Sequence, residues 1–230
     1  MPSISFDPAA NYYDATRGYP APVAEAIGAA LCAAANLGVG SHVLELGIGT
    51  GRIAVPLLAR GVNVAGVDIS SRMLDRLQAN LAAQRARDTG RTWGELEARV
   101  ADTTALPYAA ATFDAVIAVH VFHLVDGWER ALDEALRVLR TDGVLIVGQD
   151  RHPQALAHEI QQRWIEIVHE LGAEAAYVGA GYESIVTALR DRGLEITTTT
   201  PVSWMTHTRP CDELDLIARR SLSRTWDIPE

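Results

Sequence analysis

The chain has 230 residues and a formal net charge of -9; 48% of its residues are hydrophobic and 21% are charged. This length favours one domain with an insertion, and a chain of this size can bury a core without disulfide or metal staples. The acidic balance argues against a nucleic-acid partner, because negative surfaces repel phosphate backbones. The two cysteines, Cys32 and Cys211, form no CxxC motif, which suits a reducing cytoplasm.

The sequence shows no signal peptide and no membrane segment. The first twenty residues are polar and lack an apolar core. The longest apolar run, Val116–Val125, is broken by His120 and His123 and is too short to span a bilayer. We therefore expect a cytoplasmic protein without a membrane partner, acting as a monomer or homodimer.

Short apolar runs alternate with amphipathic stretches from about Val43 to Gly148. Runs that are apolar at nearly every position predict strands buried on both faces, as in a parallel sheet covered by helices. The expected strands are Val43–Leu46, Val62–Val67, Leu96–Val100, Ala115–Val119 and Val144–Val147. A turn is expected at Thr141–Gly143, before the last of them.

Helical periodicity marks the stretches between and after these strands. Ser70 is an expected N-cap, and Met73, Leu77 and Leu81 then recur on one stripe. An ion pair between Asp133 and Arg137 is expected to support a later helix. The expected helices are Ala24–Ala35, the one that follows Ser70, Trp128–Arg140, Gln154–Leu171, Glu183–Arg192 with Gly193 after its end, and Asp212–Arg220.

The organisation after Asp150 departs from this alternation. Leu194–Trp204 is expected to be a strand, because its threonines favour an extended backbone. No further strand is visible before Glu230. The expected organisation is a single domain, residues 1–230, with a helical cap at 1–40, a core at 41–150, a helical lid insertion at 151–193, and a strand and helix at 194–230.

The most informative segment reads Val43-Leu44-Glu45-Leu46-Gly47-Ile48-Gly49-Thr50-Gly51-Arg52. Glycines at three alternate positions permit conformations that a Cβ forbids and let a ligand approach the main chain. The helix that follows offers free N–H groups to a carboxylate or phosphate. This pattern predicts the first βα turn of a nucleotide-binding sheet. The dinucleotide fingerprint GxGxxG would need glycine where Arg52 stands.

Acidic residues follow the next two strands. Asp68 ends the second strand, where a carboxylate can accept both ribose hydroxyls of an adenosine. Asp102 follows the third strand, and the glycine turn follows the first. All three project at one sheet edge, the edge where open α/β sheets bind ligands. A helix-terminal acid at Asp68 and a loop acid at Asp102 are the plainer alternatives.

These features resemble class I S-adenosylmethionine (SAM)-dependent methyltransferases, in particular the small-molecule "type 11" family. The ExGxGxG order from Glu45 is similar to motif I of that class. Phe113–Val116, Glu134–Gly143 and the opening Tyr12–Pro20 also resemble segments of the type 11 proteins. The resemblance covers about residues 10–150. It implies a doubly wound, mostly parallel Rossmann-like α/β sheet of seven strands, of which we find no seventh.

The resemblance also implies SAM as cofactor and an unidentified small molecule as methyl acceptor. Gly47, Gly49 and Gly51 would contact the methionine part, and Asp102 and Thr103 the adenine. Tyr13 and Arg17 would close over the cofactor, with Arg17 toward its carboxylate; a packing role for Tyr13 and a core role for Ile69 remain open. The expected cofactor-binding residues are Tyr13, Arg17, Glu45, Gly47, Ile48, Gly49, Thr50, Gly51, Asp68, Ile69, Met73, Asp102, Thr103 and His120.

His120 and His123 follow the fourth strand and are the candidate catalytic residues. Histidine titrates near neutral pH, so either can take a proton from the acceptor, or contact the cofactor, or cap a loop. Trp164, Tyr177 and Tyr182 are candidate walls of the acceptor site. The histidines show no metal-ligand spacing, so no metal site is expected.

Two other functions share parts of this pattern. An NAD(P)-dependent oxidoreductase would share the glycine turn and Asp68, but Arg52 and the absence of any lysine for a Tyr-x-x-x-Lys pair disfavour it. A module that binds SAM without catalysis would differ only in activity.

Overall fold

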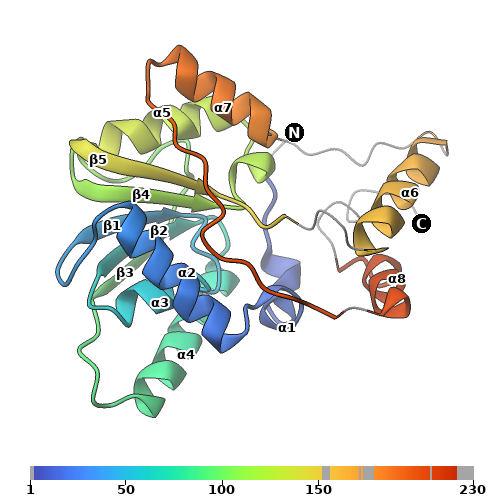
Figure 1. Cartoon of the computed structure of the whole chain (residues 1–230), viewed down its shortest axis with the longest axis horizontal. Coiled ribbons are helices and arrows are strands. Elements are labelled where there is room, and N and C mark those ends of the chain that lie inside the picture. The colour runs from blue at the N-terminus through green and yellow to red at the C-terminus, as the bar shows by residue number, and fades with distance from the viewer. Residues whose placement is uncertain (1–2, 152–155, 171, 173–178, 208, 222–230) are drawn as a thin grey trace.

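The computed structural model of the protein describes residues 3–151, 156–170, 172, 179–207 and 209–221 (Figure 1). Its centre is a five-stranded sheet with helices on both faces. The strands are β1 (His42–Leu46), β2 (Asn63–Asp68), β3 (Leu96–Val100), β4 (Phe113–Val119) and β5 (Leu139–Gly148). All neighbouring pairs are parallel, in the order β3-β2-β1-β4-β5. This confirms the predicted parallel α/β architecture.

Two separate cores explain why the central strands are apolar at nearly every position. Successive side chains of a strand point to opposite faces of the sheet. In β1, Val43 enters the core beneath the helices α2 (Ala21–Ala34), α3 (Ala54–Leu58) and α4 (Ser71–Arg87). Its neighbour Leu44 enters the other core, against α5 (Trp128–Val138) and α7 (Tyr182–Asp191). Both residues are fully buried, so β1 is held from both sides.

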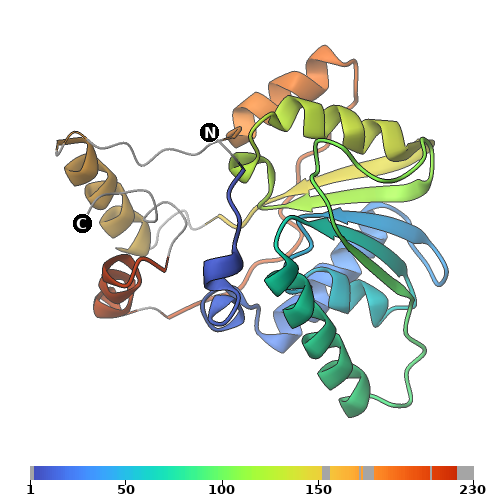
Figure 2. The ribbon, with the colours of Figure 1, turned by 180° about the vertical axis from the view of Figure 1, so that it is seen from behind.

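The cap helix α1 (Tyr13–Arg17) lies near the carboxyl ends of the strands (Figures 1 and 2). Farther out on the same side, α6 (Leu156–Glu170) and α8 (Pro210–Ala218) pack on each other. The predicted ends of the lid helix fall at residues outside the described part of the chain. Short 3-10 turns lie at Asp7–Ala9 and Phe122–Leu124.

The helix α4 begins as its sequence predicts. The Ser70 side chain accepts a hydrogen bond from the backbone N–H of Met73 at 3.1 Å, which satisfies a donor at the helix start. Met73, Leu77 and Leu81 are buried on one face. Gly193 follows α7 with a φ of +74°, as predicted for the residue after a helix end.

The strand predicted at Leu194–Trp204 is wrong. This segment has no regular secondary structure and crosses the face of the sheet that carries α2 (Figure 1). Ile196 packs against the core that includes residues of α5 and α7. The Trp204 ring meets the Tyr19 ring edge-on, with the ring centroids 5.6 Å apart. Threonine favours strands only where a neighbouring strand and a half-buried face exist, and this segment pairs with no strand in the described residues.

Two smaller predictions are also wrong. Thr141–Gly143 lies within β5 rather than in a turn before it, although the pairing register with β4 shifts there. Arg137 does not pair with Asp133: its guanidinium bonds the Glu134 carboxylate at 2.6 and 2.8 Å. Asp133 instead accepts hydrogen bonds from Arg192, the residue directly after α7. The predicted pair does not form because Glu134 binds Arg137 from three residues away and Arg192 binds Asp133.

Replacing Ser70 with alanine tests the cap of α4. The change leaves the Met73 N–H without its partner and also removes the Ser70 hydroxyl that donates to Asp7. We expect the free energy of unfolding to fall by about 1–2 kcal/mol, measured by urea denaturation. The matched control, Ser71→Ala at the exposed neighbouring position, should change it by less than about 0.5 kcal/mol. Equal losses in both variants would contradict the capping role.

Candidate functional site

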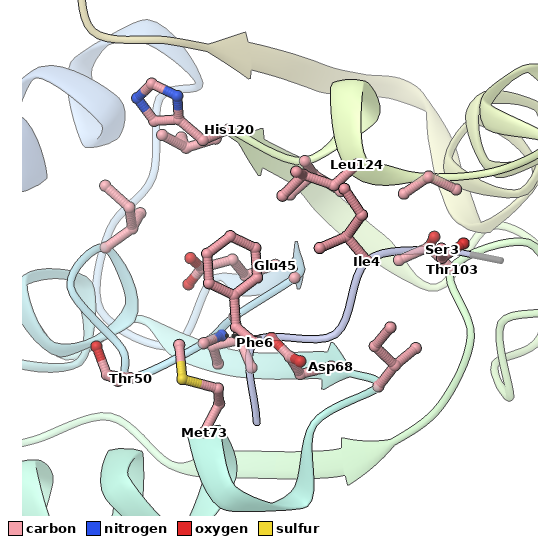
Figure 3. A pocket seen from close by; sticks show the side chains of 18 of the residues that line it. Ser3, Ile4, Phe6, Glu45, Thr50, Asp68, Met73, Thr103, His120 and Leu124 are labelled. Carbon is pink, nitrogen blue, oxygen red and sulfur yellow. Dashed lines mark hydrogen bonds between the residues drawn. The ribbon is translucent and has the colours of Figure 1, made fainter. Parts of the chain in front are cut away.

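A cavity of about 760 Å³, partly open to solvent, lies at the carboxyl end of the sheet (Figure 3). The residues that line it are Ser3, Ile4, Phe6, Tyr13, Glu45, Gly47, Ile48, Gly49, Thr50, Arg52, Ile53, Asp68, Ile69, Met73, Asp102, Thr103, Val119, His120, Val121, Leu124 and Val125. We call it the first cavity. It sits where β1 and β4 are neighbours and their connections leave in opposite directions, which is where open α/β sheets bind ligands.

Part of the glycine turn lines the first cavity. Gly47 and Gly49 line it with φ values of +61° and +55°, which favour glycine. Gly51, at φ +85°, does not line it: a Cβ there would collide with Leu77 of α4. The third glycine thus permits close helix packing, whereas the first two leave the main chain accessible to a ligand.

Asp68 ends β2 with its carboxylate in the wall of the first cavity (Figure 3). One carboxylate oxygen accepts the Gly49 N–H and the other the Ser70 N–H, each at 2.9 Å. Burial raises the pKa of Asp68, and these backbone donors act against that rise. Each oxygen retains acceptor capacity, so the carboxylate can still bind hydroxyl groups.

Glu45 lies in β1 at the bottom of the same cavity and is only 3% exposed. Burial raises its pKa well above the usual range, although the Arg52 charge and the Ala54 N–H lower it. Its Oε2 atom is buried and has no hydrogen-bond partner in the described residues. Buried polar atoms are normally bonded, so this oxygen marks a position where a ligand donor fits.

Asp102, Thr103 and Ile69 form another side of the first cavity. The Oδ1 atom of Asp102 accepts the Thr104 N–H and hydroxyl, both at 2.8 Å. These bonds hold the loop after β3 and leave the second carboxylate oxygen for another donor. Ile69 is 36% exposed, so it lies on the cavity wall rather than deep in the core.

An N-terminal segment that sequence reasoning missed covers the first cavity. Ser3, Ile4 and Phe6 line it, and in the view of Figure 3 the Phe6 ring crosses in front of Glu45. The Ile4 N–H donates to the Leu124 carbonyl at 3.0 Å, which fixes the segment beside the loop after β4. These contacts join distant parts of the chain, and no local motif signals them.

The cap helix α1 is fixed to the glycine turn by Asp14. Its carboxylate accepts the Thr50 hydroxyl at 2.5 Å and the Asn80 amide at 2.9 Å. Tyr13, the residue before Asp14, lines the first cavity, and its predicted contact with a cofactor stays a prediction. Arg17 does not line this cavity: its guanidinium donates to the Ser221 carbonyl at 3.4 Å.

His120 stands at the end of β4 in a strained backbone conformation, with φ +56°. Such conformations in residues other than glycine are uncommon and concentrate at functional sites. Its Nε2 atom lies 2.9 Å from the Asp150 backbone nitrogen and 3.2 Å from Asp150 Oδ2. Burial opposes ionisation of Asp150, but hydrogen bonding and charge from His120, with Arg52 and Tyr19, hold its pKa below the usual range.

A second cavity of about 790 Å³ adjoins the first, and His120 and Val121 line both. The residues that line it are Ala118, His120, Val121, Phe122, His123, Val147, Gly148, Gln149, Asp150, Ala180, Gly181, Tyr182 and Ile185. Burial, with smaller effects from His120 and Arg17, lowers the pKa of His123 to about 4. His123 is therefore neutral at pH 7.

The structure brings most predicted site residues together. Among the predicted cofactor residues, all except Arg17 and Gly51 line the first cavity. His123 and Tyr182 line the second; Trp164 lines neither, and Tyr177 lies outside the described residues. Sequence reasoning missed Tyr19 and Asp150 as a pair: the Tyr19 hydroxyl lies 3.0 Å from the Asp150 carboxylate. A carboxylate two residues after the end of β5, at the edge used by Asp68, was an available signal for Asp150.

Comparison with known proteins identifies the family. A family model described as a methyltransferase domain matches residues 44–147. An uncharacterised methyltransferase of Mycobacterium tuberculosis is 31% identical over 219 residues, which cover 95% of this chain and 77% of that protein. The chain therefore belongs to the methyltransferase family that its sequence resembles.

Two further similarities define the extent of that relationship. A candidate S-adenosyl-L-methionine-dependent methyltransferase of known structure from Methanococcus maripaludis superposes with a TM-score of 0.60 at 16% identity, covering 84% of this chain and 87% of that one. The fold is accordingly the Rossmann-like fold of class I methyltransferases. An uncharacterised M. tuberculosis protein is 34% identical over 119 residues, 52% of this chain, and the match spans only 40% of that relative.

Neither a membrane helix nor a metal site emerges from the described part of the chain. None of its helices is both long and apolar enough to cross a bilayer. In the same residues, no three His, Cys, Asp or Glu side chains gather where they could hold a metal ion.

The neutral state of His123 predicts a pH-dependent stability. The unfolded chain takes up a proton at this residue near pH 6.5, the folded protein only near pH 4. Stability attached to His123 is therefore complete above pH 6.5 and is lost as the pH falls toward 4. Between pH 7.5 and 5 we expect the wild type to lose about 1–2 kcal/mol more unfolding free energy than His123→Gln, measured by urea denaturation. The same loss in both proteins would refute the neutral, buried state of His123.

Proposed function

We propose that this protein transfers a methyl group from SAM to a small-molecule acceptor. The observation that carries the proposal is the pair of adjoining cavities at the carboxyl edge of the sheet, with His120 and Val121 in their common wall. Methyl transfer needs a cofactor site and an acceptor site in contact, so that donor and nucleophile meet in line. The family membership of the chain supports the same reaction.

The residues of the first cavity fit the parts of SAM. Asp68 would accept the ribose hydroxyls, and Asp102 with Thr103 would bind the adenine, beside Ile69. The unpartnered Glu45 oxygen suits an ammonium donor such as that of the methionine part. The exposed main chain at Gly47 and Gly49 allows the same part to approach closely.

The cofactor supplies an electrophilic methyl group on its sulfonium, and the protein supplies binding, orientation and electrostatics. The second cavity would hold the acceptor with its nucleophilic atom toward the His120 wall. His120, ordered by Asp150, and the neutral His123 stand where a proton leaving the acceptor can be received. The N-terminal segment over the first cavity would exclude water from the reacting atoms.

The other two functions remain as outcomes of experiment. An NAD(P)-dependent oxidoreductase would bind NADH at the same turn, but the family membership and Arg52 argue against it. A module that binds SAM without catalysis would bind the cofactor in the same way and transfer nothing.

Calorimetric titration with S-adenosylhomocysteine tests the cofactor site. The wild type should bind this product of SAM, and Asp68→Asn should bind it roughly tenfold to hundredfold more weakly, because a charged acceptor of the ribose hydroxyls is lost. Asp75→Asn, on the exposed face of α4, is the matched control and should bind as the wild type does. If the wild type binds NADH and not S-adenosylhomocysteine, the proposal fails.

Filling the second cavity tests the acceptor site. Gly181 lines it, and a Cβ built there has no atom within 4 Å, so Gly181→Phe can start into open space and add bulk to the cavity. In a screen of phenols, amines and acids with labelled SAM, the wild type should methylate at least one class. Gly181→Phe should lower that activity at least about tenfold while S-adenosylhomocysteine affinity is kept. Gly90→Phe, also in open space but in a distant loop, should keep both; full activity in Gly181→Phe would place the acceptor elsewhere.

A further inference from the structure

Arg52 is a site residue that neither the sequence analysis nor the comparisons assign. It follows the glycine turn directly and lines the first cavity. Its side chain is 13% exposed. Among the described residues that line the first cavity, Arg52 is the one arginine, and no lysine is present. A buried arginine is costly unless its charge serves a partner.

The guanidinium of Arg52 is held from one side. It lies over the Tyr19 ring, with its central carbon 4.9 Å from the ring centroid. Nη1 donates to the Arg17 carbonyl at 3.1 Å, and the nearest carboxylate oxygen, of Asp150, is 3.9 Å away, beyond hydrogen-bond distance. Tyr19 and His120 already bind that carboxylate.

Most donors of Arg52 therefore remain for another group. A guanidinium has five N–H donors in a fixed fork, and a single hydrogen bond from Arg52 to the described residues is present. A planar fork binds a carboxylate with two parallel hydrogen bonds. The position beside Gly47 and Gly49 is where the proposed function places the methionine part of the cofactor.

Arg17 is the arginine that the family resemblance places at the carboxylate of the cofactor. Its guanidinium instead lies 6.0 and 5.7 Å from the Phe6 and Tyr13 ring centroids and donates to Ser221. It does not line the first cavity. The geometry thus separates the two arginines: Arg17 packs the cap, and Arg52 faces the ligand space.

We infer that Arg52 binds the carboxylate of the cofactor's methionine part, with its guanidinium held against the Tyr19 ring and by the Arg17 carbonyl. This inference rests on the proposed function, because it takes SAM as the ligand of the first cavity. It adds a specific recognition of the amino-acid end of the cofactor to the recognition of its adenosine end.

A pair of ligands isolates that recognition. S-adenosylhomocysteine carries the carboxylate, whereas 5′-methylthioadenosine keeps the adenosine and the thioether but lacks the amino-acid end. Calorimetric titration of both should show that Arg52→Gln weakens S-adenosylhomocysteine roughly tenfold to hundredfold and changes 5′-methylthioadenosine by less than about threefold. Arg87→Gln, on the exposed end of α4, is the matched control and should leave both affinities unchanged.

Two more variants keep the test decisive. Arg52→Lys retains the charge without the fork and should weaken S-adenosylhomocysteine selectively, even if Arg52→Gln does not fold. Arg17→Gln should not alter the ratio of the two affinities. Equal weakening of both ligands in the Arg52 variants, or no weakening, would overturn the inference and leave the proposed function standing. A wild type that binds neither ligand would overturn both.

Discussion

The parallel direction of all five strands is the constraint on which the rest of the structure depends. It brings every strand's carboxyl end to one edge, and the order of the strands places β1 beside β4 at the point where their connections diverge. Both cavities lie at this edge. The strands are held by cores on both faces, so the loops that carry the site start from buried, regular segments. Packing of the sheet, away from the cavities, thus fixes the positions of the site residues.

Polar contacts then join the separate loops into one site. Thr50 in the glycine turn binds Asp14 of the cap helix, and Asp68 binds the main chain of Gly49. Asp150, after the last strand, lies at hydrogen-bond distance from both His120 and Tyr19. Each contact links groups from different parts of the chain, and hydrogen bonds of charged groups are strong in partly buried sites. The strain at His120 is tolerated because its neighbours hold it in place.

The sequence predicted what local pattern and topology determine. The bounds predicted for β3 are those observed, and Ser70 caps α4, because apolar runs and cap residues act over a few neighbours. Asp68 and Asp102 line the same cavity because the carboxyl ends of parallel strands lie at one edge of the sheet. The strand at Leu194–Trp204 failed because threonine propensity supplies no pairing partner. Phe6 and Asp150 were missed because their roles arise from contacts between residues distant in sequence.

A crystal structure with S-adenosylhomocysteine tests the central claim most directly, namely that the carboxyl edge of the parallel sheet binds the cofactor beside an acceptor site. We expect the ribose at Asp68, the adenine at Asp102 and Thr103, and the sulfur toward His120 and the second cavity. A ligand bound elsewhere, or with its sulfur turned away from the shared wall, would contradict it.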